Sequence, residues 1–319
     1  LITYGALTAT SFTSCTRGQS GTQDATHTAG AIVQQADTFI GWGNAATSLT
    51  DGQQLRLWGK DNFGEDLVFN VNNGGVYYWD KSGGVSAPAV ALSAKAGADG
   101  FAPTVATQVL VSELGKHVIC LGANEQVSST QDPMLIRWSD TENPNIWQVL
   151  NENNAGDYRL SSGSKIIGGI KTRQEILIWT DTSLYSMSFI GPPLTFALNL
   201  INEGAGLIGP KAAANSPKGV FYMSKNGFYF YNGSVKRLSC SVLSYVLDNL
   251  NINQRFKVFG LLNKEFNEVW WFYPSTQDNT GEISRYVIYN YLEDSWSIGQ
   301  LIRTSWLDQD VFDRPLATA

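Results

Sequence analysis

The chain has 319 residues, of which 43% are apolar and 16% are charged, so it can bury a sizeable core and does not have the composition of a disordered tail. Its net charge of −6 and isoelectric point near 5.0 argue against a protein that attracts nucleic acid or an anionic membrane to a basic surface. With 31 Gly and 10 Trp, the composition is typical of many short strands and tight turns, and we expect an all-β fold.

Few residues of this sequence are suited to bind a metal. The three cysteines, Cys15, Cys120 and Cys240, are far apart and form no CxxC pair, and only His27 and His117 could join them. A zinc site needs about four ligands, and an odd number of cysteines does not suit a disulfide framework. We therefore expect buried free thiols, no metal and no cofactor. We also expect no secretion signal and no membrane span, because no apolar run reaches roughly 18 residues.

The first 54 residues are rich in Thr, Ser, Ala and Gly, and we predict a β-rich N-terminal platform or linker segment over 1–54. Short runs at 31–34 and 38–42 are predicted as edge strands, and the RGQSGT stretch at 17–22 as a turn. This stretch lacks the spacing and the lysine of a phosphate loop. His27 has no neighbour that would orient it as a base, and we interpret it as a loop histidine.

From residue 55 the character changes, and strand-like runs alternate with turn residues. The runs at 67–69 and 76–79 flank an Asn-Asn-Gly-Gly loop, which predicts a β-hairpin. Acidic residues near these strands invite a metal or paired-acid hypothesis, but their spacing matches no calcium loop, and polar turn residues explain them better. These residues are Asp61, Glu65, Asp66 and Asp80.

A Gly/Ala/Pro-rich connection over 81–104 is predicted to run extended over the surface, and a second hairpin follows it at 108–112 and 117–121. His117 begins the second of these runs, and we interpret it as a structural histidine rather than as a ligand. In the next run, Arg137 lies between strand residues and could face a partner or a lumen.

Strand-like runs that carry an aromatic residue recur at Trp79, Trp138, Trp179, Tyr222 and Trp271, with separations of 59, 41, 43 and 49 residues. A spacing of about 40 to 50 residues with four strands is what a β-propeller blade needs, because one blade must stack on its neighbours. A two-sheet sandwich predicts no such recurrence. We therefore predict an irregular β-propeller over 55–319, with these aromatic residues in the blade cores.

One segment, 241–259, departs from the β pattern. Its apolar residues recur at helical spacing and Ser241 is a suitable N-cap, so we predict one helix or two short ones. Asp248 and Glu265 would be the candidate general acid and base of a glycosidase. Nothing in the sequence brings these two carboxylates together, and we predict no catalytic residue and no enzymatic activity.

The last part of the chain carries a dense aromatic series, with runs at 269–273 and 286–291. Flat aromatic faces suit sugars and nucleic-acid bases. In strands, however, aromatic residues also make ordinary core and cross-strand contacts. We favour core packing for most of them.

Four parts of the sequence are long and specific: DNFGEDLVFN with GGVYYWD at 61–80, STQDPMLIRWSD at 129–140, RLSSGSKIIGGIKTRQEILIWTDTSLYSMSFIGPP at 159–193, and FNEVWWFYPS with RYVIYNYLEDSW at 266–296. These stretches resemble a short-tailed bacteriophage (podovirus) tail protein. The resemblance extends roughly over 55–310. Within these tail proteins, the chain resembles the tail nozzle proteins of the tail tubular protein B group. It is also similar to the packaged-DNA stabilisation proteins.

The resemblance implies a structural virion protein of the phage tail, built on an irregular β-propeller with added platform elements. It implies a ring, a homohexamer in the family, that lies below the portal, retains packaged DNA and conducts it during DNA ejection. The partners that it implies are further copies of the same chain, the tail adaptor protein above, tail fibre or tailspike proteins, and double-stranded DNA in transient, non-specific contact.

A neutral or acidic wall would let DNA pass without the counterion-release affinity of a basic surface. Five cations are candidates for an inward ring or a subunit contact, although the simpler interpretation of each is a solvated turn charge. These cations are Lys171, Arg173, Lys225, Lys236 and Arg237.

The alternative function is a carbohydrate-binding or depolymerising phage tail protein. A depolymerase would need two carboxylates about 5 to 10 Å apart in a groove. A groove lined only by aromatic residues would indicate binding without hydrolysis. A DNA-binding enzyme, a third interpretation, is disfavoured by the acidic isoelectric point and the lack of a basic cluster.

Overall fold

The computed structural model describes residues 57–278 and 281–307, together with short strands at 2–3, 6–7, 12–13, 16–17 and 316–318. The chain separates into two compact units, Leu1–Asn44 and Ala45–Ala319.

Within the first unit, the strands that the structure describes form two short antiparallel pairs. They are β1 (Ile2–Thr3) with β4 (Thr16–Arg17), and β2 (Ala6–Leu7) with β3 (Phe12–Thr13). The strands expected at 31–34 and 38–42, and His27, lie outside the described residues. The platform or linker over 1–54 and its boundary therefore stay predictions.

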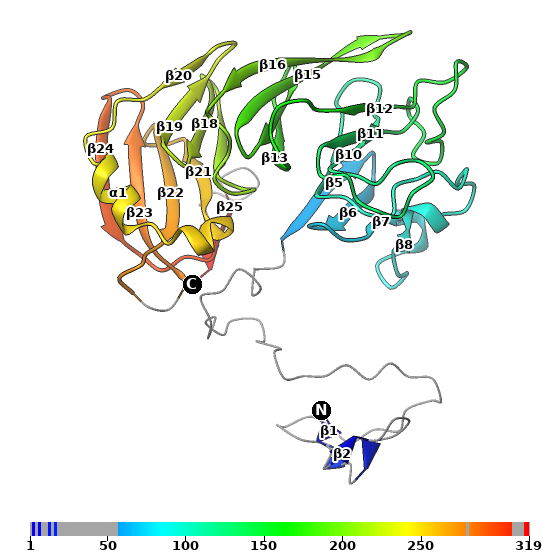
Figure 1. Ribbon diagram of the computed structural model, residues 1–319, viewed down its shortest axis with the longest axis horizontal. Helices are drawn as coiled ribbons and strands as arrows, with labels where there is room; N and C mark the ends of the chain where they lie inside the picture. The colour runs from blue at the N-terminus through cyan, green and yellow to red at the C-terminus, as the bar shows by residue number, and fades with distance from the viewer. Residues whose placement is uncertain are drawn as a thin grey trace. The chain divides into compact units, whose positions relative to one another are not determined.

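In the second unit, the described residues form five four-stranded antiparallel sheets that follow one another along the chain (Figure 1). Blade 1 contains β5 (Trp58–Phe63), β6 (Asp66–Val71), β7 (Val76–Trp79) and β8 (Val90–Ala91). Blade 2 contains β9 (Gln108–Val111), β10 (Val118–Leu121), β11 (Leu135–Trp138) and β12 (Gly156–Arg159). Blade 3 contains β13 (Ile166–Lys171), β14 (Ile176–Thr180), β15 (Ser183–Gly191) and β16 (Thr195–Glu203).

Blade 4 contains β17 (Ala213–Ser216), β18 (Gly219–Ser224), β19 (Gly227–Tyr231) and β20 (Val235–Arg237). Blade 5 contains β21 (Phe259–Asn263), β22 (Glu268–Pro274), β23 (Ile283–Asn290) and β24 (Ser295–Gln300). A last pair joins β25 (Ser305–Leu307) to β26 (Leu316–Thr318). In every blade each strand pairs only with its neighbours in the chain. Successive meanders of this kind are the architecture of a β-propeller, and the predicted irregular propeller is confirmed.

The first strand of each blade is its inner strand. Strand β5 lies against β9, β9 lies against β13, and β17 lies against β21. Lys211, two residues before the first strand of blade 4, forms a parallel bridge with Phe259 of β21. Neighbouring blades therefore meet along their first strands, while their fourth strands lie outermost in each sheet.

The five aromatic residues of the sequence repeat fall in five different blades. Trp138, Trp179, Tyr222 and Trp271 are buried, and Trp79 is half-buried. They occupy the third strand in blades 1 and 2 and the second strand in blades 3 to 5. The long separation of 59 residues reflects the connection between β7 and β9, and that of 49 residues reflects the helical insertion before blade 5. The repeat was degenerate because these insertions differ.

Aromatic contacts join the blades to one another. The ring of Trp179 in blade 3 lies 5.2 Å from that of Tyr222 in blade 4, and Phe228 of blade 4 lies 4.8 Å from Trp271 of blade 5. Such ring pairs add roughly 0.5 to 1.5 kcal/mol beyond the area that they bury. Most side chains of the aromatic series therefore pack in the core.

The insertion between blades 4 and 5 contains the helix α1 (Leu243–Asn249) and the 3-10 helix η5 (Ile252–Lys257), so the predicted short helical insertion at 241–259 is confirmed and consists of two helices. Its predicted N-cap is wrong. The cap is Val242, which accepts from the amide of Val246, so Ser241 lies one residue too early to bond the first turn. Among the described helices, none has the length and the apolar run needed to cross a membrane.

The connection over 81–104 is more structured than the sequence indicated. It contains the 3-10 helices η3 (Lys81–Gly83) and η4 (Leu92–Ala94), and between them β8 completes blade 1. Leu92 is fully buried in the core between blades 1 and 2. Most residues of the connection lie at the surface, as predicted, but the path is not extended, and the sequence missed β8 because a two-residue strand is too short to give a pattern.

Close approach of the inner strands requires a small residue at 59. A Cβ on Gly59 would lie 2.3 Å from Oδ1 of Asn70 and 3.1 Å from the amide nitrogen of Val109. Asn70 cannot move away freely, because its amide accepts from Val109 N at 3.0 Å and donates to Ala106 O at 2.9 Å.

We predict that Gly59→Ala lowers the free energy of unfolding by about 3 kcal/mol, since it breaks buried hydrogen bonds between blades 1 and 2. The control is Gly64→Ala in the turn after β5, where φ is +66° and no atom lies within 4 Å of the new Cβ. That change carries only the backbone cost of about 1 kcal/mol. Urea unfolding of the two variants measures the difference, and equal losses would contradict the packing argument.

Candidate functional site

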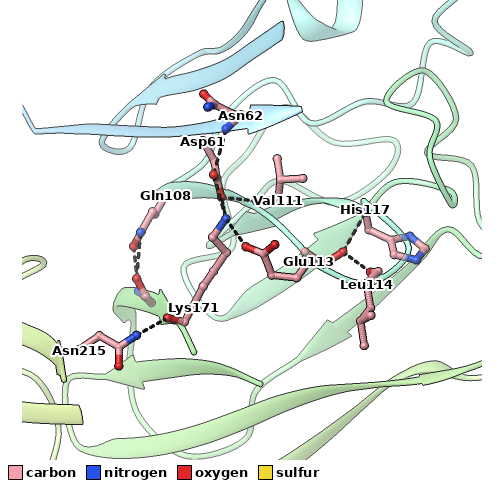
Figure 2. Close-up of polar contacts among 11 residues, drawn as sticks. Asp61, Asn62, Gln108, Val111, Glu113, Leu114, His117, Lys171 and Asn215 are labelled. Carbon is pink, nitrogen blue, oxygen red and sulfur yellow. Dashed lines mark hydrogen bonds and ion pairs between the residues drawn. The ribbon is translucent and has the colours of Figure 1, made fainter. Parts of the chain in front are cut away.

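Polar side chains from four blades meet where the inner strands converge (Figure 2). The ammonium of Lys171, at the end of β13, lies 2.7 Å from Oδ2 of Asp61 on β5 and 3.3 Å from Oε1 of Glu113, which follows β9. We call Asp61, Glu113 and Lys171 the axial cluster. It connects blades 1, 2 and 3 through one cation and two carboxylates.

Strand alternation explains why Asp61 takes this place. Successive side chains of a strand point to opposite faces, so Asp61 shares a face of β5 with Gly59, which lies against β9. Its carboxylate also accepts from the amide of Val111 at 2.8 Å, and its side chain is only 14% exposed. The ion pair with Lys171 is thus shielded from solvent more than a surface pair would be.

Two further contacts hold the inner strands together. The side-chain amide of Gln108 on β9 donates to the carbonyl of Gly169 at 3.0 Å and accepts from its N–H at 2.8 Å. The amide of Asn215 on β17 donates to the carbonyl of Lys171 at 3.1 Å. Side chains therefore replace the missing strand-to-strand ladder between blades 2, 3 and 4.

The geometry of the axial cluster suits a structural role better than catalysis. A glycosidase holds its two carboxylates on either side of a space that the sugar enters. Here the ammonium of Lys171 occupies the space between Asp61 and Glu113. Neither carboxylate is arranged as a general acid or base toward an open groove.

The other acid pair considered from the sequence does not come together. Asp248 lies on α1, and the residue after this helix, Leu250, forms a bridge with Ser275 just beyond the end of β22. Glu265 lies at the other end of β22, in the turn before this strand begins. The length of this seven-residue strand separates the two ends by about 20 Å. Asp248 and Glu265 therefore cannot act on one glycosidic bond.

The five candidate cations do not form one group within the chain. Lys171 and the exposed Arg173 lie at the end of blade 3 that contacts Asn215 of blade 4. Lys225 lies at the opposite end of β18, beside Asn226, whose carbonyl accepts from Arg237 at 2.9 Å. Lys236 lies on the outer strand β20 and is exposed. Their gathering into an inward ring is thus not a property of a single subunit.

Two polar residues singled out in the sequence are buried in blade 2. Arg137 is 1% exposed and donates to the carbonyls of Phe101 at 2.6 Å and Asn124 at 3.2 Å, so it faces neither a partner nor a lumen. His117 Nδ1 lies 2.7 Å from the carbonyl of Ser139, and its ring packs edge-on against Phe196 at 5.2 Å. Both side chains fix loops and strands of this region.

Beside the axial cluster the inner strands enclose a cavity of about 240 Å³. Its walls come from β9, β13, β14, β17 and β21 and from the loop before β17, and the charged residue among them is Lys211. No pattern in the sequence indicates this cavity, because a lysine that lies shortly before a strand resembles any solvated turn charge.

The thiols and potential metal ligands are dispersed. Cys120 is buried and Cys240 is half-buried, and both are free. In the ranges that the structure describes, no three His, Cys, Asp or Glu side chains are grouped as metal ligands. Burial raises the pKa of the Cys120 thiol to about 12, so it stays protonated at neutral pH.

Comparison with known proteins identifies no family. No protein-family model matches the sequence, and no curated protein matches it. One similar solved structure is the computationally designed Ika8 protein, with 11% identity, a match over 79% of this chain and 65% of that chain, and a TM-score of 0.46. Another is Kluyveromyces lactis Hsv2, with 12% identity, a match over 78% of this chain and 65% of that chain, and a TM-score of 0.41. A third is the AfRom2 CNH domain, with 12% identity, a match over 80% of this chain and 86% of that chain, and a TM-score of 0.40. The chain spans about two thirds of the first two. Likenesses this weak carry no argument about function.

We predict that Gln108→Ala lowers the free energy of unfolding by about 2 kcal/mol, because it leaves the N–H and the carbonyl of Gly169 without partners. Gln300→Ala on the exposed face of β24 is the matched control and should change the stability by less than about 0.5 kcal/mol. Chemical unfolding of both variants provides the measurement. A Gln108 variant as stable as the control would show that this contact does not hold the blades together.

The burial of His117 predicts a dependence of stability on pH. Burial lowers the pKa of His117 in the folded chain, although the Ser139 carbonyl and the charge of Asp140 oppose the shift. The unfolded chain, with a pKa near 6.5, therefore binds the proton more readily. The stabilisation is complete above pH of about 6.5 and is lost as the pH falls from there toward the folded pKa.

The measurement is the free energy of unfolding at a series of pH values between 5 and 8. His117→Gln should be less stable at pH 8 but should lose the part of the pH slope that begins as the pH falls below about 6.5. An unchanged slope in the variant would mean that other groups cause it.

Proposed function

We propose that this chain is the structural subunit of a podovirus tail nozzle, a virion ring that retains packaged DNA and conducts it during ejection. The observation that carries the proposal is the resemblance over residues 55–310 together with its place in the fold. The resembling stretches supply strands of blades 1, 2, 3 and 5, so the resemblance coincides with the propeller.

The contacts among the inner strands bear on the path of DNA in the proposed nozzle. Lys171 and Asp61 lie 2.7 Å apart near the meeting point of the inner strands, and Gln108 bonds directly to Gly169. A DNA duplex, whose major groove alone is about 12 Å wide, does not fit between such contacts. The conduit of the proposed nozzle therefore lies between subunits, as in a ring closed by one repeated heterologous interface.

The hairpin of β15 and β16 offers a contact for such an interface. Each of its strands has nine residues, against six in β13 and five in β14, and its tip projects beyond the rest of blade 3 (Figure 1). The tip exposes the apolar side chains of Ile190 and Leu194, the latter at 69%. Exposed apolar side chains on a projecting element suit a contact with another subunit or with a tail partner.

The mass of the purified assembly tests the proposal. Six copies of the 34.9 kDa chain give about 210 kDa (6 × 34.9 kDa), and electron microscopy should show a closed ring with a central channel. A longer parent chain raises the mass in proportion. A monomer that releases sugar from a bacterial capsule would overturn the proposal and favour a depolymerase.

We predict that the double variant Ile190→Ser, Leu194→Ser shifts the assembly toward smaller species, by at least tenfold in the apparent dissociation constant, while monomer stability changes little. The reason is that both side chains are exposed in the isolated chain, so their loss costs only intersubunit contact. Val127→Ser, at a position 90% exposed in another blade, is the control. Mass photometry over a dilution series measures the change, and identical dilution curves for the two proteins would exclude the hairpin from the interface.

A second candidate is a carbohydrate-binding tail protein, which a row of aromatic residues on blade 1 favours. The ring of Phe69 lies 6.0 Å from that of Trp58 and is stacked on that of Tyr77 at 5.5 Å, and Trp58 is 42% exposed. Such faces suit sugar rings. Glycan binding by a monomer, lost in Trp58→Ala, would support this candidate over the nozzle.

A further inference from the structure

One broad face of blade 1 is left uncovered by the described part of the chain. In the middle strands of blades 2, 3 and 4, such as β10, β11, β14 and β18, nearly every residue is buried, because another blade lies on either side. In β6 and β7 of blade 1, buried residues alternate with half-buried ones. The buried set forms the core with blade 2, and the other set has no part in that core.

The uncovered face of blade 1 has the composition of a protein interior. An antiparallel sheet with one face in water alternates apolar residues inside with polar residues outside. The side chains that β5, β6 and β7 direct outward do not follow this pattern, because only Lys60 and Asn62 among them are neither apolar nor aromatic. The others are Trp58, Leu67, Phe69, Val71, Tyr77 and Trp79. This face therefore suits packing against another apolar surface better than contact with water.

The series of blades has a second uncovered face at its other end. The β25–β26 pair packs on blade 5 through Trp306, whose ring lies 6.4 Å from that of Trp270 and 6.3 Å from that of Phe272. Leu307 and Leu316 are direct neighbours across this pair, and strand alternation turns them away from blade 5. They are 53% and 51% exposed. The last sheet is thus apolar on both of its faces.

The two uncovered faces do not cover each other within one chain, since Trp58, Leu307 and Leu316 all stay exposed. The two faces are unlike, and contacts between unlike surfaces join subunits head to tail. We propose that the uncovered face of blade 1 binds the outer face of the β25–β26 pair of a second copy of this chain. The contact continues, from copy to copy, the face-to-face packing that joins blades within the chain. It rests on the proposed function, because it joins copies of the proposed ring.

The area of the blade 1 face indicates that this contact does not act alone. With strands about 4.8 Å apart and a rise of about 3.3 Å per residue, a four-stranded sheet six residues long offers at most roughly 400 Å². A standard interface buries about 800 Å² on each partner. The β15 and β16 hairpin, where Ile190 and Leu194 are exposed, offers the further contact that such an interface needs.

Cross-linking between two differently tagged copies tests the contact, in a background that carries Cys15→Ser and Cys240→Ser. Asn62→Cys places a thiol on the uncovered face of blade 1, and Ser305→Cys places one on the outer face of β25, both at exposed positions. A short bismaleimide should join these two variants to each other at least tenfold more than it joins either to the control. The control is Ser129→Cys, in an exposed loop of blade 2.

Three results would overturn the proposal. The first is a yield between the two variants no higher than that with the Ser129 control. The second is efficient cross-linking of Asn62→Cys chains to one another, which would show that like faces meet. The third is a chain with both thiols that is joined only within itself at every dilution, since its own faces would then cover each other.

Electron microscopy of the same assembly separates this contact from the proposed nozzle. The cross-link between Asn62→Cys and Ser305→Cys in an assembly that is not a closed ring would support the contact and contradict the nozzle. A closed ring of six copies without that cross-link would support the nozzle and contradict the contact.

Dilution keeps the test independent of the introduced thiols. Trp58→Ser and Leu307→Ser should each raise the apparent dissociation constant of the assembly at least tenfold, because each removes an exposed apolar side chain from one of the two faces. Val127→Ser is again the control. Glycan binding that is lost in Trp58→Ser while self-association is unchanged would assign the face to a sugar and overturn the proposal.

Discussion

The ion pair between Lys171 and Asp61 is the contact on which the arrangement of the blades depends. The two residues are 110 positions apart in the sequence and belong to blades 3 and 1, with Glu113 of blade 2 beside them. Each blade is a separate meander, so no strand ladder continues from one blade to the next. Packing of aromatic rings joins the broad faces of the sheets, but it is non-directional. The axial cluster and the Gln108 contact fix the position of one blade relative to the next, because an ion pair or a bidentate hydrogen bond tolerates little displacement.

The elements of this fold were predictable where the signal is local. The hairpin around Asn72 to Gly75 and the strand pair in blade 3 follow from turn residues between β-prone runs, and the recurrence of Trp179, Tyr222 and Trp271 marked three successive blades. The axial cluster was not predictable. Asp61 was interpreted as a turn charge and Lys171 as a solvated or inward-facing one, because the spacing of residues from different blades carries no periodicity. Arg137 was misplaced for the same reason, since its partners are backbone carbonyls of distant loops.

The inner strands of neighbouring blades are joined by side-chain contacts, from Asp61 to Lys171, from Gln108 to Gly169 and from Asn215 to Lys171. A propeller whose inner strands are bonded through side chains is a rigid block, and a rigid block acts on large partners through its loops, edges and projecting hairpins. Most aromatic residues at the blade centres take part in packing, whereas the β15 and β16 hairpin and the aromatic row of blade 1 keep exposed side chains that can contact another molecule.

A double-mutant cycle between Asp61 and Lys171 tests the central claim most directly. The free energy of unfolding would be measured for Asp61→Ala, Lys171→Met and the double variant, with the exposed pair Glu65 and Lys81 as reference. If the axial ion pair couples blades 1 and 3, the two losses are non-additive by about 1 kcal/mol or more, whereas the reference pair shows less. Losses that add within about 0.3 to 0.5 kcal/mol would contradict the account, because residues that do not interact behave in that way.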